Sequence, residues 1–245
     1  MTPMIDLHCH ILPELDDGAQ SLQEALEMVH IAVQSGVKRL VATPHCSHDQ
    51  RSEVQRSYRL LRDAVKELKM PLELYLGMEI YGRADTAKLL RDGKLLTLNG
   101  SRYPLVEFDF LSSGEEETWI LKELIQTGYR PLVAHPERYL YLQQEPELIN
   151  EWHRMGCLFQ INRGSLLGRF GGNAQELALA MIDRGFATAV ASDAHSASRR
   201  TPWMQDIQIR LNRDFSPETG KFLLRHYPKM IIENRELPHW EPEWF

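Results

Sequence analysis

The sequence predicts an α/β protein whose parallel strands close, or nearly close, into a barrel with helices outside. Short apolar segments alternate with helical segments about seven times, which is typical of parallel strands covered by helices. No linker, low-complexity segment or repeat divides the 245 residues, and single barrels commonly have this length. An open, doubly wound sheet is the alternative, but the glycine-rich phosphate loop expected after its first strand is missing.

The predicted elements follow one another as strand and helix along the chain. Strands are apolar runs of about four to eight residues bounded by turn residues. The first helix begins at a capping box made by Ser21 and Glu24 and ends near Gly36. The predicted strands are 4–10, 37–43, 72–79, 103–108, 131–134, 157–161 and 187–191. The later helices are 51–69, 85–90, 114–126 and 173–184, with a longer one that is interrupted around Pro146 and leads to Gly156.

Composition and charge argue against several classes of protein. A formal net charge of −6, without any run of lysine and arginine, does not suit a general nucleic-acid binder. The start of the chain has no basic or apolar leader, and no apolar stretch approaches the ~20 residues that cross a bilayer. Cys9, Cys46 and Cys157 are odd in number and widely spaced, unlike a disulfide framework. We therefore expect a cytoplasmic protein without membrane insertion.

The first predicted strand ends in two histidines one residue apart, His8 and His10. Side chains alternate between the faces of a strand, so these two imidazoles point the same way and Cys9 points the other. Two neutral imidazoles on one face make half of a metal site. The alternative is a pair of ordinary polar residues at a strand end, and buried packing is the better explanation for Cys9.

Every predicted strand except the sixth ends in a side chain that could bind a metal ion. A barrel builds its active site on this rim, so residues distant in sequence would converge there. Nitrogen and oxygen donors without thiolates suit Mn²⁺, Zn²⁺ or Fe²⁺, and nine ligands are enough for two or three ions. For any single residue an ordinary polar role is the commoner explanation, whereas the whole set favours metal. The nine candidates are His8, His10, Asp17, His45, Glu79, Glu107, His135, Asp193 and His195.

Several motifs together resemble the PHP (polymerase and histidinol phosphatase) superfamily, and within it the bacterial capsule and exopolysaccharide tyrosine-protein phosphatases. The resemblance extends to about Ile232. It implies a distorted (β/α)7 TIM-like barrel with three divalent ions, usually manganese, that hydrolyses phosphotyrosine on a tyrosine autokinase controlling polysaccharide export. The same nine residues would be the metal ligands. The motifs are Asp6-Leu7-His8-Cys9-His10, Asp16-Asp17-Gly18, Ala42-Thr43-Pro44-His45, Gly77-Met78-Glu79-Ile80-Tyr81, Leu105-Val106-Glu107-Phe108, Ala134-His135-Pro136-Glu137-Arg138-Tyr139, Gln160-Ile161-Asn162 and Ala191-Ser192-Asp193-Ala194-His195.

The resemblance also implies two phosphate-contacting arginines, Arg138 and Arg200, with Arg199 as the alternative to the second. Without it, a salt bridge to Glu137 would explain Arg138, and a charge at a helix start would explain Arg200. The mechanism we expect is in-line attack on phosphorus by a hydroxide that bridges two ions, since metal coordination lowers the pKa of water to about 7. Asp193 or His195 would then protonate the leaving phenolate.

Three further expectations concern the surroundings of this site. Asp6 lies on the face of His8 and is a candidate to orient an imidazole, the alternative being a polar residue near the bottom of the barrel. Asn162, Arg163 and Ser165 stand in a glycine-rich loop, 162–172, and are candidates to line the phosphate pocket, although loop flexibility alone would also explain the glycines. The whole chain, 1–245, would be one domain, with the acidic and aromatic residues 234–245 as an extension that covers the protein's own surface or docks a partner.

Two other functions stay open on the sequence alone. One is a small-molecule phosphomonoesterase such as a histidinol-phosphate phosphatase, which shares the superfamily's ligand set. The other is a non-catalytic metal-binding interaction module, although no expected ligand position is vacant. The physiological metal, the protein substrate and the oligomeric state are not predicted by the sequence.

Overall fold

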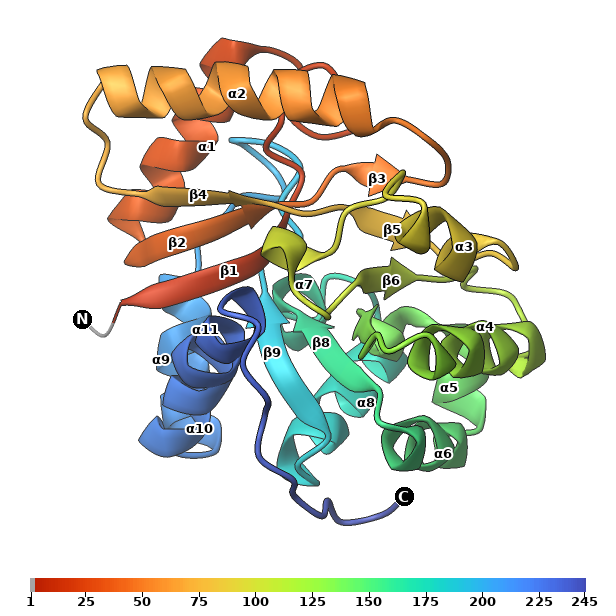
Figure 1. Cartoon of the computed structure of the whole chain (residues 1–245). Coiled ribbons are helices and arrows are strands. Elements are labelled where there is room, and N and C mark those ends of the chain that lie inside the picture. Colours follow the sequence, from red (N-terminus) through yellow and green to blue (C-terminus); the bar gives the residue numbers. More distant parts are fainter. Residues whose placement is uncertain (1–2) are drawn as a thin grey trace.

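The computed structural model describes residues 3–245 and shows parallel strands surrounded by helices (Figure 1). All strand pairs are parallel and form two sheets, with the orders β1-β2-β4 and β3-β5-β6-β7-β8-β9. The predicted alternation of strand and helix is therefore confirmed. The strands are β1 (Met4–Cys9), β2 (Val37–Ala42), β3 (His45–Cys46), β4 (Glu73–Leu76), β5 (Glu79–Tyr81), β6 (Leu105–Glu107), β7 (Leu132–Ala134), β8 (Leu158–Asn162) and β9 (Ala187–Ala191).

Two of the predicted strands are interrupted. The second predicted strand, 37–43, corresponds to β2, and after a break at Pro44 the chain forms a further short strand, β3. Residues 72–79, predicted as one strand, contain β4 and the start of β5. Proline cannot donate a backbone hydrogen bond, so the ladder breaks beside it. Pairing resumes across the break, because Gly77 N donates to Ala42 O at 2.9 Å and Glu79 N donates to Pro44 O at 3.0 Å.

The first and last strands meet at their carboxyl ends. Asp193 N donates to His8 O at 2.9 Å, and His10 N donates to Ala194 O at 2.8 Å. An isolated parallel bridge between Cys9 and Ala194 lies at the same place. Residues that directly follow β9 are thereby held beside the histidines that end β1.

The helices lie outside the strands (Figure 1). Ser21 caps the first of them as predicted, because its hydroxyl accepts a hydrogen bond from Glu24 N at 3.2 Å. The segment 162–172 is not simply a loop, since it contains the short helix α7. The helices are α1 (Leu22–Gln34), α2 (Arg51–Glu67), α3 (Thr86–Arg91), α4 (Glu115–Gln126), α5 (Leu140–Gln144), α6 (Glu147–Met155), α7 (Arg163–Leu166), α8 (Gly172–Asp183), α9 (Gln205–Asp214), α10 (Pro217–Lys221) and α11 (Tyr227–Ile232). No helix among the described residues combines the length and apolar character needed to cross a bilayer.

The amino ends of three neighbouring strands are apolar and buried, beneath the polar carboxyl ends. Leu105, Leu132 and Leu158 belong to one buried cluster, and each begins or nearly begins its strand. Leu105 and Glu107 are two residues apart on β6 and therefore share a face, as do Leu158 and Gln160 on β8. The amino ends of these faces pack as core, and their carboxyl ends present polar side chains.

Residues 234–245 fold back on the protein's own surface at the opposite end of the strands. Trp240 Nε1 donates to Gly185 O at 2.7 Å, and its indole stacks on Tyr227 with ring centroids 5.6 Å apart. The ring of Phe245 stacks on that of Phe186, just before β9, at 5.2 Å. Of the two expectations for this segment, these contacts match covering of the protein's own surface.

Candidate metal centre

The nine side chains predicted as metal ligands lie together at the carboxyl ends of the strands. Their ligand atoms fall into four groups, and within each group the atoms lie within 4.8 Å of one another. Every one of the nine belongs to at least one group, so parallel strands bring them together as expected. The groups are His10, Asp17, His45 and His195; His8, His135 and Asp193; His8, His10 and Glu79; and His45, Glu79 and Glu107.

Glu79 occupies the centre of this arrangement. Its Oε2 lies 3.1 Å from Nε2 of His8, from Nε2 of His10 and from Nδ1 of His45, while its Oε1 lies 2.9 Å from Nε2 of His135. The carboxylate is fully buried. This carboxylate belongs to two of the four ligand groups and would be a ligand of an ion held there.

The donor set fits divalent cations. Nε2 of His8 and Nε2 of His10 are only 3.1 Å apart and both face Glu79. Glu79 Oε2 is buried, and no described group makes a regular hydrogen bond to it. Buried polar atoms normally have partners, and lone pairs that converge in this way are satisfied by a metal ion.

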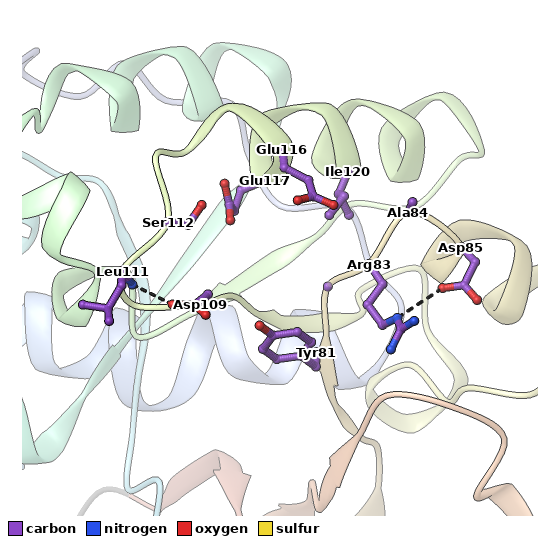
Figure 2. A pocket seen from close by; sticks show the side chains of 11 residues that line it. Tyr81, Arg83, Ala84, Asp85, Asp109, Leu111, Ser112, Glu116, Glu117 and Ile120 are labelled. Carbon is purple, nitrogen blue, oxygen red and sulfur yellow. Dashed lines mark hydrogen bonds and ion pairs between the residues drawn. The ribbon is translucent and has the colours of Figure 1, made fainter.

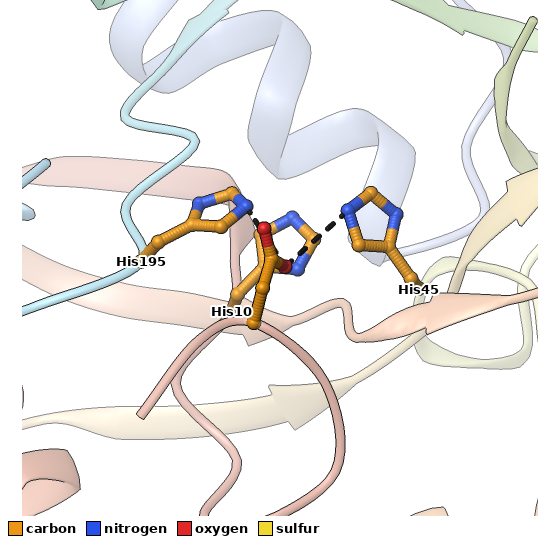
Figure 3. Close-up of side chains that lie close together, drawn as sticks. His10, His45 and His195 are labelled. Carbon is orange, nitrogen blue, oxygen red and sulfur yellow. Dashed lines mark ion pairs between the residues drawn. The ribbon is translucent and has the colours of Figure 1, made fainter. Parts of the chain in front are cut away.

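A more accessible part of the centre lies on one side of Glu79. Figure 3 shows the rings of His10, His45 and His195 gathered around a carboxylate. Asp17 Oδ1 lies 3.4 Å from Nε2 of His195 and 3.6 Å from Nε2 of His45. Nδ1 of His45 lies 2.8 Å from Glu107 Oε1, so the two ring nitrogens of this histidine belong to two neighbouring groups.

Two residues that orient the histidines were missed by sequence reasoning. Gln160 Oε1 lies 2.7 Å from Nδ1 of His8, and Asp16 Oδ2 lies 2.7 Å from Nδ1 of His10. Each contact directs Nε2 of the ring toward Glu79. Gln160 lies within β8, the strand that lacks a ligand of its own, and Asp16 directly precedes a predicted ligand. The sequence places both residues close to predicted ligands or strand ends, but it does not show which histidine each of them contacts.

The expected role of Asp6 is wrong. Its Oδ1 accepts backbone hydrogen bonds from His8 N at 3.3 Å and from Ser192 N at 3.0 Å, so it joins the backbones of the first and last strand ends. Burial raises its pKa despite these bonds.

The electrostatics of the centre favour bound positive charge. Burial alone would lower the pKa of His45, but a hydrogen bond to Glu107 and the charge of Glu79 raise it to about 9. For Asp16 burial acts in the opposite direction and would raise the pKa, but the contact of its carboxylate with His10 lowers the pKa to about 2. The carboxylates therefore stay ionised and hold protons on neighbouring imidazoles, and the same field would hold metal cations.

Two strand-end residues adopt backbone conformations that are unusual for side chains with a Cβ. His135 has φ 34° and Asp193 has φ 48°. A non-glycine residue in this region costs about 1–3 kcal/mol and persists only where the surroundings require it. Both side chains point into the cluster, so the strain accompanies their placement there.

Both predicted arginines reach the edge of the cluster. Arg138 Nη1 lies 3.4 Å and Arg200 Nη2 lies 2.5 Å from Asp193 Oδ2, to which the side-chain amide of Asn162 also donates. The contacts of Arg199 in the described structure involve its backbone. Arg200 is therefore the arginine whose guanidinium reaches the site.

Other residues near the arginines differ from expectation. Glu137 does not pair with Arg138; it is buried and accepts hydrogen bonds from Asn162 N at 2.9 Å and Ser165 Oγ at 2.6 Å. Arg163 is also buried and forms an ion pair with Asp206 at 2.6 Å. Arg163 and Ser165 therefore support the fold here instead of lining a phosphate pocket.

An aromatic pocket of about 530 Å³ adjoins the arginines. We use this name for the cavity lined by Phe110, Leu111, Arg138, Leu140 and Phe170, among others. The guanidinium of Arg138 lies between two rings, 4.7 Å from the centroid of Phe110 and 4.3 Å from that of Phe170. A flat apolar group could lie here beside a fixed cation.

Cys9 lies outside the cluster, as predicted. It is buried in the core between strands and helices, and its Sγ lies 3.8 Å from Ala194 O. Burial raises the pKa of its thiol well above the usual value, so it is protonated and unreactive. Cys46 and Cys157 are also buried and unpaired.

Comparison with known proteins identifies relatives along nearly the whole chain. The family model described as capsular polysaccharide synthesis, CpsB/CapC, matches residues 4–233. Tyrosine-protein phosphatase YwqE of Bacillus subtilis is 32% identical over 238 residues, covering 96% of this chain and 91% of YwqE. CapC of Staphylococcus aureus is 38% identical over 240 residues, covering 96% and 93%.

A solved structure agrees with these matches. It comes from work on YwqE from Bacillus subtilis and CpsB from Streptococcus pneumoniae, described as unique metal-dependent tyrosine phosphatases. It superposes on this chain with a TM-score of 0.92 at 30% identity, covering 99% of both chains. The chain therefore belongs to the CpsB/CapC family of capsular polysaccharide synthesis proteins.

Proposed function

We propose that this protein is a metal-dependent phosphatase that hydrolyses phosphotyrosine in proteins. The observation that carries the proposal is the convergence of Arg138 and Arg200 on Asp193, at the edge of nine clustered ligands. Two guanidiniums beside a metal centre are suited to bind a phosphoryl group. The aromatic pocket beside Arg138 offers room for a tyrosine ring, and the named relatives are tyrosine-protein phosphatases.

We further propose that the nine residues hold three divalent ions, with Mn²⁺ as the first choice and Fe²⁺ or Zn²⁺ as alternatives. Four residues each belong to two of the groups, which supports several ions joined by common ligands rather than one isolated ion. They are His8, His10, His45 and Glu79. When bound, such ions supply an activated water and neutralise charge on a phosphate ester.

The protein's own residues would perform the remaining steps. Arg138 and Arg200 would donate hydrogen bonds to phosphoryl oxygens, most strongly as charge develops in the transition state. Phe110 and Phe170 would hold Arg138 in place. The charges around Asp193 keep its pKa below the usual value against the effect of burial, and burial beside His10 lowers the pKa of His195 to about 4. The pKa values therefore do not separate the two residues, and Asp193 or His195 is the proposed donor of a proton to the leaving phenolate.

Several finer features belong to the same proposal. We infer that the strands form a distorted (β/α)7 barrel of the PHP type, closed by the contacts of His8 and His10 with residues after β9. Residues 1–245 would form one domain, and 234–245 would be its extension. The substrate would be a tyrosine autokinase of capsular or exopolysaccharide synthesis. Buried, unpaired cysteines support a cytoplasmic location.

The test compares two substrates on metal-loaded and metal-stripped protein. Phosphate release from a phosphotyrosyl peptide should require added Mn²⁺, Fe²⁺ or Zn²⁺ and should exceed release from histidinol phosphate. Faster turnover of histidinol phosphate would instead favour the small-molecule phosphatase. A protein that binds no metal and releases no phosphate from either compound would be a non-catalytic module. Anomalous scattering from crystals grown with metal would give the number and element of the ions.

A further inference from the structure

A second cavity, of about 610 Å³, opens between the start of helix α4 and the residues that follow β5 and β6 (Figure 2). We call it the acidic pocket, because four carboxylates and a single guanidinium line it. Arg83 is already close to one of these carboxylates, with Nε 3.7 Å from Asp85 Oδ1, so negative charge dominates. The residues that define it are Tyr81, Arg83, Asp85, Asp109, Glu116 and Glu117.

Glu117 is the member of the acidic pocket that most needs a partner. It is only 5% exposed, and its Oε2 is buried with no hydrogen-bond partner in the described structure. Figure 2 shows Glu116 and Glu117 hanging from α4 on the side that faces Asp109 and Tyr81. Acidic residues in a first helical turn interact favourably with the helix dipole. This interaction does not give the buried Oε2 of Glu117 a hydrogen-bond donor. An unpaired buried carboxylate is costly, and a cationic ligand would remove the cost.

The acidic pocket lies directly beside the candidate metal centre. Tyr81 is two residues after Glu79 on β5, and its Cα is the sheet partner of Glu107 on β6. Asp109 follows Glu107 by two residues. The acidic pocket and the candidate metal centre therefore share the ends of β5 and β6.

The acidic pocket also adjoins the aromatic pocket. Leu111 lines both cavities and is 77% exposed. A peptide whose phosphotyrosine ring lies beside Arg138 would therefore have to cross only Leu111 for a neighbouring side chain to enter the acidic pocket. The metal centre and its arginines attract an anion, whereas the cavity beyond Leu111 attracts a cation.

We propose that the acidic pocket binds a lysine or arginine side chain next to the phosphotyrosine of the substrate, and so selects peptides with a basic residue there. This inference rests on the proposed phosphotyrosine phosphatase activity. A metal ion is not the expected occupant, because none of the close ligand groups found among residues 3–245 includes a carboxylate of this pocket. The volume is instead in the range that protein pockets offer to organic groups.

The test uses phosphotyrosyl peptides that carry lysine or alanine at each flanking position in turn. At one or more positions, lysine should raise kcat/KM about two- to fivefold over alanine, and added salt should reduce the preference. Glu116→Gln and Glu117→Gln should each weaken it. Glu115→Gln should retain it, because Glu115 is exposed in the same helical turn but does not line the pocket.

A small substrate separates the two levels of the proposal. p-Nitrophenyl phosphate has no flanking residues, so its turnover should be the same in wild type and in all three glutamine variants. Wild-type enzyme that hydrolyses it but shows no preference for lysine at any position would overturn the role of the acidic pocket alone. Metal-loaded enzyme that hydrolyses neither p-nitrophenyl phosphate nor any peptide would overturn the phosphatase function itself. Since Glu116 is exposed, its variant tests the pocket even if Glu117→Gln does not fold.

Discussion

Gln160 Oε1 lies 2.7 Å from Nδ1 of His8 although 152 residues separate them in the sequence. This contact sets the imidazole so that Nε2 faces Glu79. We predict that Gln160→Ala lowers metal affinity about 10- to 100-fold, as loss of such outer partners commonly does. Titration calorimetry with Mn²⁺ would measure the change. Gln144→Ala, at an exposed helix end, is the control, and equal affinities in the two variants would contradict the role of Gln160.

Arg200 and its neighbour Arg199 offer a matched pair for testing phosphate recognition. Arg200→Ala should lower kcat/KM for a phosphotyrosyl peptide about 100-fold, the scale on which loss of one transition-state donor acts. Its metal content should stay unchanged. Arg199→Ala should change kcat/KM by no more than about twofold, as surface substitutions do. Similar losses in both variants, measured by initial rates on metal-loaded protein, would rule out a specific phosphate contact by Arg200.

Cys9 lies between two candidate ligands in sequence but faces the core. Cys9→Ala should therefore keep the wild-type kcat per bound metal. Because the substitution leaves a small void, it should cost about 1 kcal/mol of unfolding free energy and lower Tm by about 2–4 °C. Calorimetry and steady-state kinetics would measure the two effects. Lost turnover in a variant with normal metal content would point instead to a cysteine nucleophile.

The raised histidine pKa values predict opposite effects of pH on the metal-free and metal-loaded protein. The pKa of His45 is raised from 6.5 to about 9 in the folded state, and those of His8 and His10 are raised as well. These three shifts oppose and outnumber that of His195, whose pKa is lowered to about 4. Between pH 6.5 and 9 the folded metal-free protein thus binds more protons than the unfolded chain, so its stability should fall as pH rises through this window.

Metal ions displace these protons, so the stabilisation they provide should increase with pH across the same window. Thermal unfolding with chelator and with Mn²⁺, at both ends of the window, would measure the two trends. A metal-free protein that is more stable at the alkaline end would show that the carboxylates do not hold protons on the histidines.

Trp240 tests the C-terminal extension. Trp240→Ala removes the stacking on Tyr227 and the hydrogen bond to Gly185 O, and should cost about 2–4 kcal/mol of unfolding free energy. Metal content and kcat should not change, because the segment lies at the opposite end of the strands from Glu79. Trp240→Phe should recover part of the stability, since it keeps the stacking. A large loss of kcat in folded Trp240→Ala would contradict this separation.

The sequence predicts which side chains meet at the centre, because the rule involved is local. Each candidate ends a strand or follows one closely, and parallel strands bring their carboxyl ends to one rim. Their role as metal ligands stays a prediction. Gln160 and Asp16 could not be assigned to His8 and His10, because those contacts depend on pairing across the fold.

Other parts of the fold lacked a local signal. The strand after Pro44 has only two residues, His45–Cys46, too few for a strand pattern to be visible, and α7 is too short for a helical period to be visible. The acidic pocket is assembled from residues after β5, after β6 and at the start of α4. No single stretch of sequence displays it.

Both ends of the described chain lie away from the metal centre. Met4 begins β1 and bonds to Gly36 O, while Phe245 is held against Phe186 and Asn150 beyond the amino ends of β8 and β9. A fluorophore, an affinity tag or a surface tether attached next to Met4 or Phe245 would therefore lie away from the candidate metal centre. An immobilised enzyme of this kind could accept a bulky phosphoprotein without obstruction from its own anchor.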